Sequence, residues 1–181
     1  MTFLPMSDDA ELPRESLSAA EGSAELRGGR LTHLDRTLLG HPPSFEAYAG
    51  WGRLKDELEP FIGERAVALF AYAISDAADC RLGAATFRRI LIESGDTPDA
   101  PQVTETERLL LDWGRMIATD PNGIPEEFRA RLERAFSPQL RLILVAFAGQ
   151  TVAMNVFATV GRVPLDAALE EFCRPDGERV D

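Results

Sequence analysis

An uncharged stretch near the carboxyl end is the feature that most constrains the fold. From Leu142 to Val160 the sequence LILVAFAGQTVAMNVFATV contains no charged residue, which approaches the roughly 20 apolar residues of a transmembrane helix. Gln150, Thr151 and Asn155 interrupt the stretch, however, and it is rich in Ala and Gly rather than Leu. We therefore expect a helix buried on all sides in a bundle or at a subunit interface, and no membrane contact.

From Leu31 onward the chain shows helical periodicity between short breaks, and the sequence contains almost no alternating β pattern. Prolines, glycines and capping residues mark the helix ends, and Thr104 with Glu107 has the spacing of a capping box. Asp79 is the predicted N-cap of the helix that follows it. The pattern predicts an all-α fold with helices over residues 31–39, 44–58, 64–78, 80–94, 105–118, 125–136, 137–160 and 164–173.

The same pattern predicts the domain organisation. Residues 1–30 are rich in Ser, Ala, Glu, Pro and Gly and are expected to form a flexible N-terminal arm. Residues 31–173 form a single helical domain, and residues 174–181 form a C-terminal tail.

Composition narrows the range of partners. Asp and Glu outnumber Lys and Arg by 30 to 19, which gives a net charge of −11. Affinity for nucleic acid and for anionic membranes depends on Lys and Arg, so we expect neither as a partner. Two cysteines and two histidines are too few for a structural zinc site or a disulfide framework. We therefore expect no metal ion, no cofactor and a reducing, cytoplasmic environment.

Several segments, taken in order, are similar to a known family. They are RTLLGHP at 36–42, AISDAADCR at 73–81, TDP at 119–121, FSP at 136–138, and the helix with Asn155 that leads into VPLD at 163–166. In this order and spacing, the chain resembles the carboxymuconolactone decarboxylase and AhpD-like alkylhydroperoxidase superfamily over residues 31–172. The resemblance implies an AhpD-like multi-helix bundle with a central antiparallel helix pair.

The peroxidase branch of that family carries Cys-x-x-Cys-x-x-x-His at the start of a helix, and a Glu on the preceding helix. The helix N-terminus stabilises a thiolate, the second thiol closes a disulfide, and His and Glu relay protons. By the resemblance, Cys80 matches the first Cys, whereas Gly83, Phe87 and Ala68 stand at the positions of the second Cys, the His and the Glu. The motif is therefore degenerate, and the two-thiol cycle within it is excluded.

Cys80 remains a candidate catalytic residue. The dipole of the following helix favours its thiolate, but Asp79 beside it and Asp76 four residues earlier favour the neutral thiol. Because these effects nearly cancel, the sequence favours an inert, buried cysteine over a reactive one.

Asp76 and Asp79 are the other candidate catalytic residues. Their spacing, with Tyr72 one helical turn before Asp76, would let them line one polar notch and carry out acid/base chemistry. In the simpler interpretation Asp79 is a helix cap, and Asp76 faces solvent or pairs with Arg81 or Arg88.

Three functions are compatible with these residues. The leading prediction is an oligomeric binding or scaffold protein, with a small molecule or a partner as ligand, that lacks two-cysteine peroxidase activity. The alternatives are a one-cysteine peroxide-reducing oxidoreductase that uses Cys80, and a decarboxylase-like acid/base enzyme that uses Asp76 and Asp79.

One structural feature separates these functions. We expect Phe87 and Leu82 to fill the site, as the binding or scaffold function requires. An open pocket and a cation beside Cys80 would favour the peroxidase alternative instead. The uncharged helix that ends at Val160 further predicts a homo-oligomer.

Overall fold

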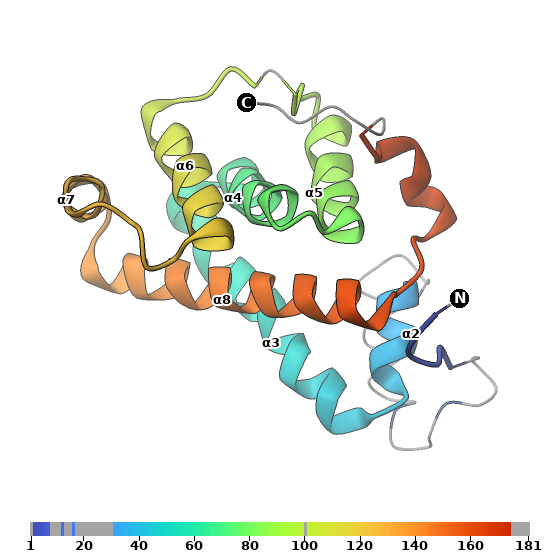
Figure 1. The fold of residues 1–181 in the computed structure, drawn as a ribbon. Helices are drawn as coiled ribbons and strands as arrows, with labels where there is room; N and C mark the ends of the chain where they lie inside the picture. Colours follow the sequence, from blue (N-terminus) through green and yellow to red (C-terminus); the bar gives the residue numbers. More distant parts are fainter. Residues whose placement is uncertain (1, 8–11, 13–15, 17–30, 100, 175–181) are drawn as a thin grey trace.

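The computed structural model describes residues 2–7, 12, 16, 31–99 and 101–174, and within them it contains only helices and their connections (Figure 1). The helices are α2 (His33–Leu39), α3 (Pro42–Ile62), α4 (Glu64–Ala77), α5 (Arg81–Glu93), α6 (Glu105–Thr119), α7 (Glu126–Ala135), α8 (Pro138–Gly161) and the 3-10 helix η3 (Ala167–Phe172). The predicted all-α fold is confirmed. Most of the predicted N-terminal arm and tail lies outside the described residues.

Helix α3 differs from its predicted range of 44–58. Pro42 and Pro43 belong to its first turn, where a helix requires no backbone N–H donor. Pro60 lies in its last turn, so the missing N–H costs a single hydrogen bond at the helix end. Gly63 ends the helix, because its φ of 84° lies in the region that favours glycine.

Helix α4 is the centre of the bundle. Every residue from Ala66 to Ser75 is buried, and in Figure 1 the helix lies between α5 and α6, with α8 running across it. Alanines keep it narrow enough for close approach. A Cβ added at Gly114 of α6 would lie 3.1 Å from the Cβ of Ala73 and 3.1 Å from the carbonyl oxygen of Phe70. Helices α4 and α6 therefore pack closely against each other at this glycine.

Aromatic rings join the other helices to this centre. The ring of Phe70 in α4 lies 5.7 Å from that of Trp113 in α6 and 6.2 Å from that of Phe147 in α8. Trp51 in α3 lies 5.3 Å from Phe147 and 5.7 Å from Phe87 in α5. Its indole N–H also donates to Thr151 of α8 at 3.1 Å. These rings form one continuous core across five helices.

Helix α8 is only partly buried, so the expectation of burial on all sides within the bundle is wrong for the single chain, whereas the alternative, burial at a subunit interface, stays a prediction. Its inner face supplies buried residues to the core, namely Leu144, Phe147, Ala148, Thr151, Asn155, Ala158 and Gly161. Its outer face exposes Leu142, Val145, Val156 and Val160 by 69%, 55%, 56% and 63%. By length and composition the helix could cross a membrane, but core helices of globular proteins meet the same criterion.

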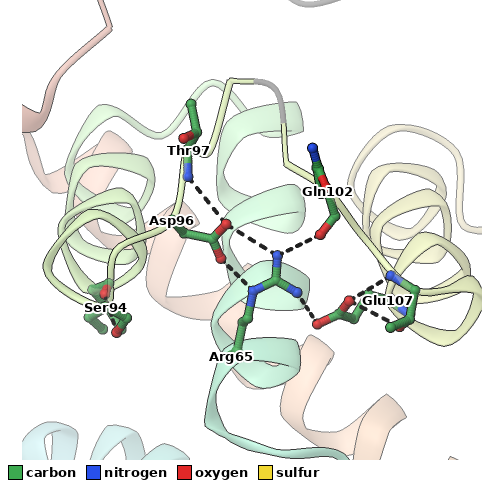
Figure 2. Close-up of polar contacts among 8 residues, drawn as sticks. Arg65, Ser94, Asp96, Thr97, Gln102 and Glu107 are labelled. Carbon is green, nitrogen blue, oxygen red and sulfur yellow. Dashed lines mark hydrogen bonds and ion pairs between the residues drawn. The ribbon is translucent and has the colours of Figure 1, made fainter.

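Arg65 of α4 ties the connection between α5 and α6 to the centre of the bundle (Figure 2). Its guanidinium donates to both carboxylate oxygens of Asp96, to the carboxylate of Glu107 and to the carbonyl oxygen of Gln102. Glu107 also accepts from the backbone N–H and the hydroxyl of Thr104, at 2.8 and 3.0 Å. The predicted capping box at the start of α6 is therefore confirmed.

These contacts change the titration of both carboxylates. The Arg65 guanidinium lowers the pKa of Asp96 below its ordinary value, more than burial raises it. Burial raises the pKa of Glu107, but hydrogen bonds from Thr104 and Arg65 outweigh it, and the net pKa is lowered. Since both values are depressed, the stabilisation is complete above the ordinary carboxyl pKa and is lost as pH falls through the folded values.

We predict that Arg65→Met lowers the free energy of unfolding at pH 7 by about 1–2 kcal/mol, because charged hydrogen bonds are lost at a partly screened site. The variant should also lose less stability than the wild type between about pH 5 and pH 3. Urea unfolding at several pH values measures both effects.

Arg89→Met is the matched control. Arg89 pairs with Glu93 on the surface of α5, where the two side chains are 42% and 54% exposed. Its loss should cost under about 0.5 kcal/mol. Equal losses in the two variants would show that the Arg65 contacts contribute no more than a surface pair.

Candidate functional site

Cys80 is the N-cap of α5, not the first residue of that helix. Its backbone N–H donates to the carbonyl oxygen of Ser75 at 3.0 Å, and Asp79 before it has a φ of 55°. The chain thus reverses within the turn after α4, and the prediction that Asp79 caps α5 is wrong. The sulfur of Cys80 accepts from the backbone N–H of Gly83 at 3.5 Å, and the residue is 2% exposed.

Ser75 and Asn155 fill the space beside Gly83, the position that the resemblance gives to a second cysteine. The Ser75 hydroxyl donates to the side-chain oxygen of Asn155 at 3.2 Å. A Cβ added at Gly83 would lie 2.5 Å from that oxygen and 2.8 Å from the Ser75 hydroxyl. No side chain fits at this position without displacing one of these groups.

Phe87 and Ala68 belong to the core. Phe87 is 7% exposed and its ring packs against Trp51, and Ala68 is 5% exposed within α4. Apolar packing therefore occupies the positions of the family's His and Glu. These positions offer no group that could transfer a proton.

A surface pocket of about 200 Å³ lies beside Cys80. It is lined by the start of α5 and the end of α8, through Asp79, Cys80, Arg81, Leu82, Ala158, Thr159, Arg162 and Val163. Leu82 forms part of its wall, whereas Phe87 packs against Trp51 instead of lining it. The expectation that Phe87 and Leu82 fill the space beside Cys80 is therefore wrong.

The two candidate carboxylates do not meet in this pocket. Asp79 is exposed and lines it, whereas Asp76 does not line it. A carboxylate oxygen of Asp76 lies 2.9 Å from a guanidinium nitrogen of Arg174. Arg88, one of the two partners expected for Asp76, forms an ion pair with Asp99. The arrangement separates Asp76 and Asp79 instead of coupling them.

Tyr72 lies beside Asp76 and is 5% exposed. Burial raises its pKa, and the charge of Asp76 raises it further, against the opposite effects of Arg174 and Arg88. The phenol therefore stays protonated at neutral pH.

Among the described residues, no group of three or more His, Cys, Asp or Glu side chains could hold a metal ion.

The sequence reasoning missed the roles of Ser75 and Asn155 at this site. Both are polar residues within apolar helical segments, and they are 0% and 5% exposed. Burying a polar side chain is costly unless it is hydrogen-bonded. A polar residue within an apolar helical segment therefore indicates a buried hydrogen bond, and this was the signal in the sequence. Their pairing joins segments 80 residues apart, which periodicity cannot show.

The fold is similar to those of several solved structures. A peroxidase-related protein from Ralstonia eutropha JMP134, described as an alkylhydroperoxidase AhpD core, superposes with a TM-score of 0.76 at 16% identity, covering 93% of this chain and 94% of that one. A peroxidase-related protein from Silicibacter sp. TM1040 gives 0.76 at 16% identity over 93% of each chain.

The debrominase Bmp8, in a complex of a cysteine-to-alanine variant with 2,3,4-tribromopyrrole, gives a TM-score of 0.77 at 17% identity over 95% of this chain and 96% of that one. No family model and no curated protein sequence matches the chain. The chain thus has the AhpD-like fold that the sequence predicted.

We predict that Gly83→Ala destabilises the protein by about 1–3 kcal/mol, because the added Cβ overpacks the Ser75–Asn155 contact. This loss should appear although Ala is the better helix former by about 1 kcal/mol. In an Asn155→Ala background the same change should cost at least about 0.5 kcal/mol less, because the nearest clashing atom is gone. Urea unfolding of the four proteins measures this coupling.

Gly52→Ala in α3 is the control, because a Cβ there would meet nothing within 4 Å. It should be neutral or stabilising. Destabilisation by Gly83→Ala no greater than by Gly52→Ala would mean that the site tolerates a side chain at position 83.

Proposed function

We propose that the Cys80 thiol reduces small organic hydroperoxides bound in the adjoining pocket, and that external thiols supply the reducing equivalents. One observation carries this proposal. The sulfur-bearing residue at the start of α5 is also part of the wall of an open pocket of about 200 Å³. A buried cysteine without such a pocket would have no route to a substrate.

The surroundings of Cys80 suit a nucleophilic sulfur. The thiolate is the reactive form of cysteine, and positive surroundings stabilise it. The sulfur accepts the Gly83 N–H at the positive end of the α5 dipole. Arg81 and Arg162 line the same pocket and would add positive potential around a developing negative charge.

The proposed reaction needs no second thiol in the motif. The Cys80 thiolate attacks the terminal oxygen of the hydroperoxide, the O–O bond breaks, and the alcohol leaves with one proton. The oxidised sulfur is a sulfenic acid. One external thiol converts it to a mixed disulfide and water, and a second releases the Cys80 thiol and an external disulfide.

Similar structures support a small-molecule substrate. Two are described as peroxidase-related proteins, and a third is a debrominase bound to a brominated pyrrole. The acid/base alternative has less support, since Asp76 is paired with Arg174 and does not line the pocket. A binding or scaffold function without catalysis is the outcome if Cys80 proves inert.

We predict that the reduced protein consumes cumene hydroperoxide at least about 100-fold faster than free cysteine, and that Cys80→Ser abolishes this excess. Stopped-flow consumption of hydroperoxide, with mass spectrometry of the thiols, measures both. A Cys80 thiol that oxidises no faster than free cysteine would overturn the proposed activity and leave the binding or scaffold function.

We also propose that the outer face of α8 associates with a second copy of the chain. Leu142, Val145, Val156 and Val160 expose more than half of their surface along one helix. Exposed apolar residues in such a row commonly mark an interaction site. Interfaces of homo-oligomers are more apolar than other surfaces, which suits the uncharged stretch from Leu142 to Val160 in an otherwise acidic chain.

We predict that Val145→Lys with Val156→Lys weakens self-association by at least about tenfold, because both charges would be buried at the interface. Light scattering after size-exclusion chromatography measures the change. Two lysines at exposed, uncharged sites of α6, Thr106→Lys and Thr119→Lys, test whether two added charges alone matter and should leave the mass unchanged. A monomeric wild type would exclude this association.

A further inference from the structure

The second cysteine of the chain contacts the residue that follows the first. Cys173 follows η3, which packs against α5. Its sulfur lies 3.3 Å from the Nε donor of Arg81, the residue next to Cys80. Cys173 is half-buried, and both cysteines are free thiols. The 93 positions that separate the two cysteines in sequence therefore do not indicate their distance in space.

Contacts hold Cys173 from two sides. On one side its sulfur accepts from Arg81 at the start of α5. On the other, Arg174 pairs with Asp76 near the end of α4 at 2.9 Å and lies over the ring of Tyr72, 5.6 Å from its centre. Asp76 and Arg81 flank the turn that carries Cys80. The segment after η3 thus lies against that turn.

We propose that Cys173 is the resolving thiol for Cys80. This inference rests on the proposed function, because it requires that a hydroperoxide first oxidise Cys80 to a sulfenic acid. In place of the first external thiol, the Cys173 thiolate attacks the Cys80 sulfur, the S–O bond breaks, and the hydroxyl group leaves as water with the proton from Cys173. The product is a Cys80–Cys173 disulfide, which an external dithiol reduces to two thiols while becoming a disulfide itself.

Because the space beside Gly83 is filled, the resolving thiol has to come from a residue that is distant in sequence. A second thiol at position 83 would clash with Ser75 and Asn155, so a thiol within the motif has no room. Cys173 approaches instead from the C-terminal segment, whose ion pairs involve partly exposed side chains. Such contacts are weak and permit the shift that brings two Cα atoms within the roughly 4–7 Å of a disulfide.

The test treats the reduced full chain with one equivalent of cumene hydroperoxide, blocks the remaining thiols, and maps disulfides by mass spectrometry without reduction. We expect a linked peptide with Cys80 and Cys173 within one chain. Dimedone, which traps sulfenic acids, should label Cys80 at least about tenfold more in Cys173→Ser than in the wild type. A mixture of ¹⁵N-labelled and unlabelled chains identifies links between chains.

The outcomes separate the two proposals. Equal dimedone labelling of Cys80 in both proteins, without a linked peptide, would overturn the role of Cys173 and leave the reactivity of Cys80 intact. A linked peptide that joins labelled to unlabelled chains would also overturn it. No oxidation of Cys80 in either protein would overturn the proposed function itself, and the resolving role with it.

Discussion

Burial of α4 on all sides is the constraint on which the rest of the structure depends. A helix with ten consecutive buried residues must be surrounded by other helices, and here α3, α5, α6 and α8 all contact it. Its alanines and Gly114 of α6 permit a close crossing, while Phe70 extends the contact to α8. Because packing at this density tolerates little change in volume, the turn after α4 is held in a fixed place.

That fixed turn decides the chemistry of the site. Ser75 ends the buried stretch of α4 and reaches Asn155 of α8, and Gly83 packs against both. The space beside Cys80 is therefore divided. Towards the core it is closed by packing, which excludes a second thiol in the motif. Towards the start of α5 and the end of α8, this space opens into the pocket that Arg81 and Arg162 line.

Polar contacts at the periphery attach other segments of the chain to the central helix α4. Arg65 joins α4 to the start of α6, and Arg174 joins α4 to the C-terminal segment. Each brings a loop or a terminus to one end of the central helix. The segment with Cys173 is one of these, so the thiol and the site lie at the same end of α5. The outer face of α8, by contrast, is apolar and exposed among the residues that the structure describes.

The sequence by itself determined most of the helical segments, the capping box at Thr104, and the presence of Gly83, Phe87 and Ala68 at the positions that the resemblance gives to a second Cys, a His and a Glu. These are local properties, set by hydrophobic periodicity and residue type within one helix. Only the tertiary structure decided that Cys80 caps α5 beside an open pocket, that Asn155 closes the space at Gly83, and that Arg174 pairs with Asp76. Each of these depends on side chains from helices far apart in sequence, whose approach is set by packing that a linear pattern does not contain.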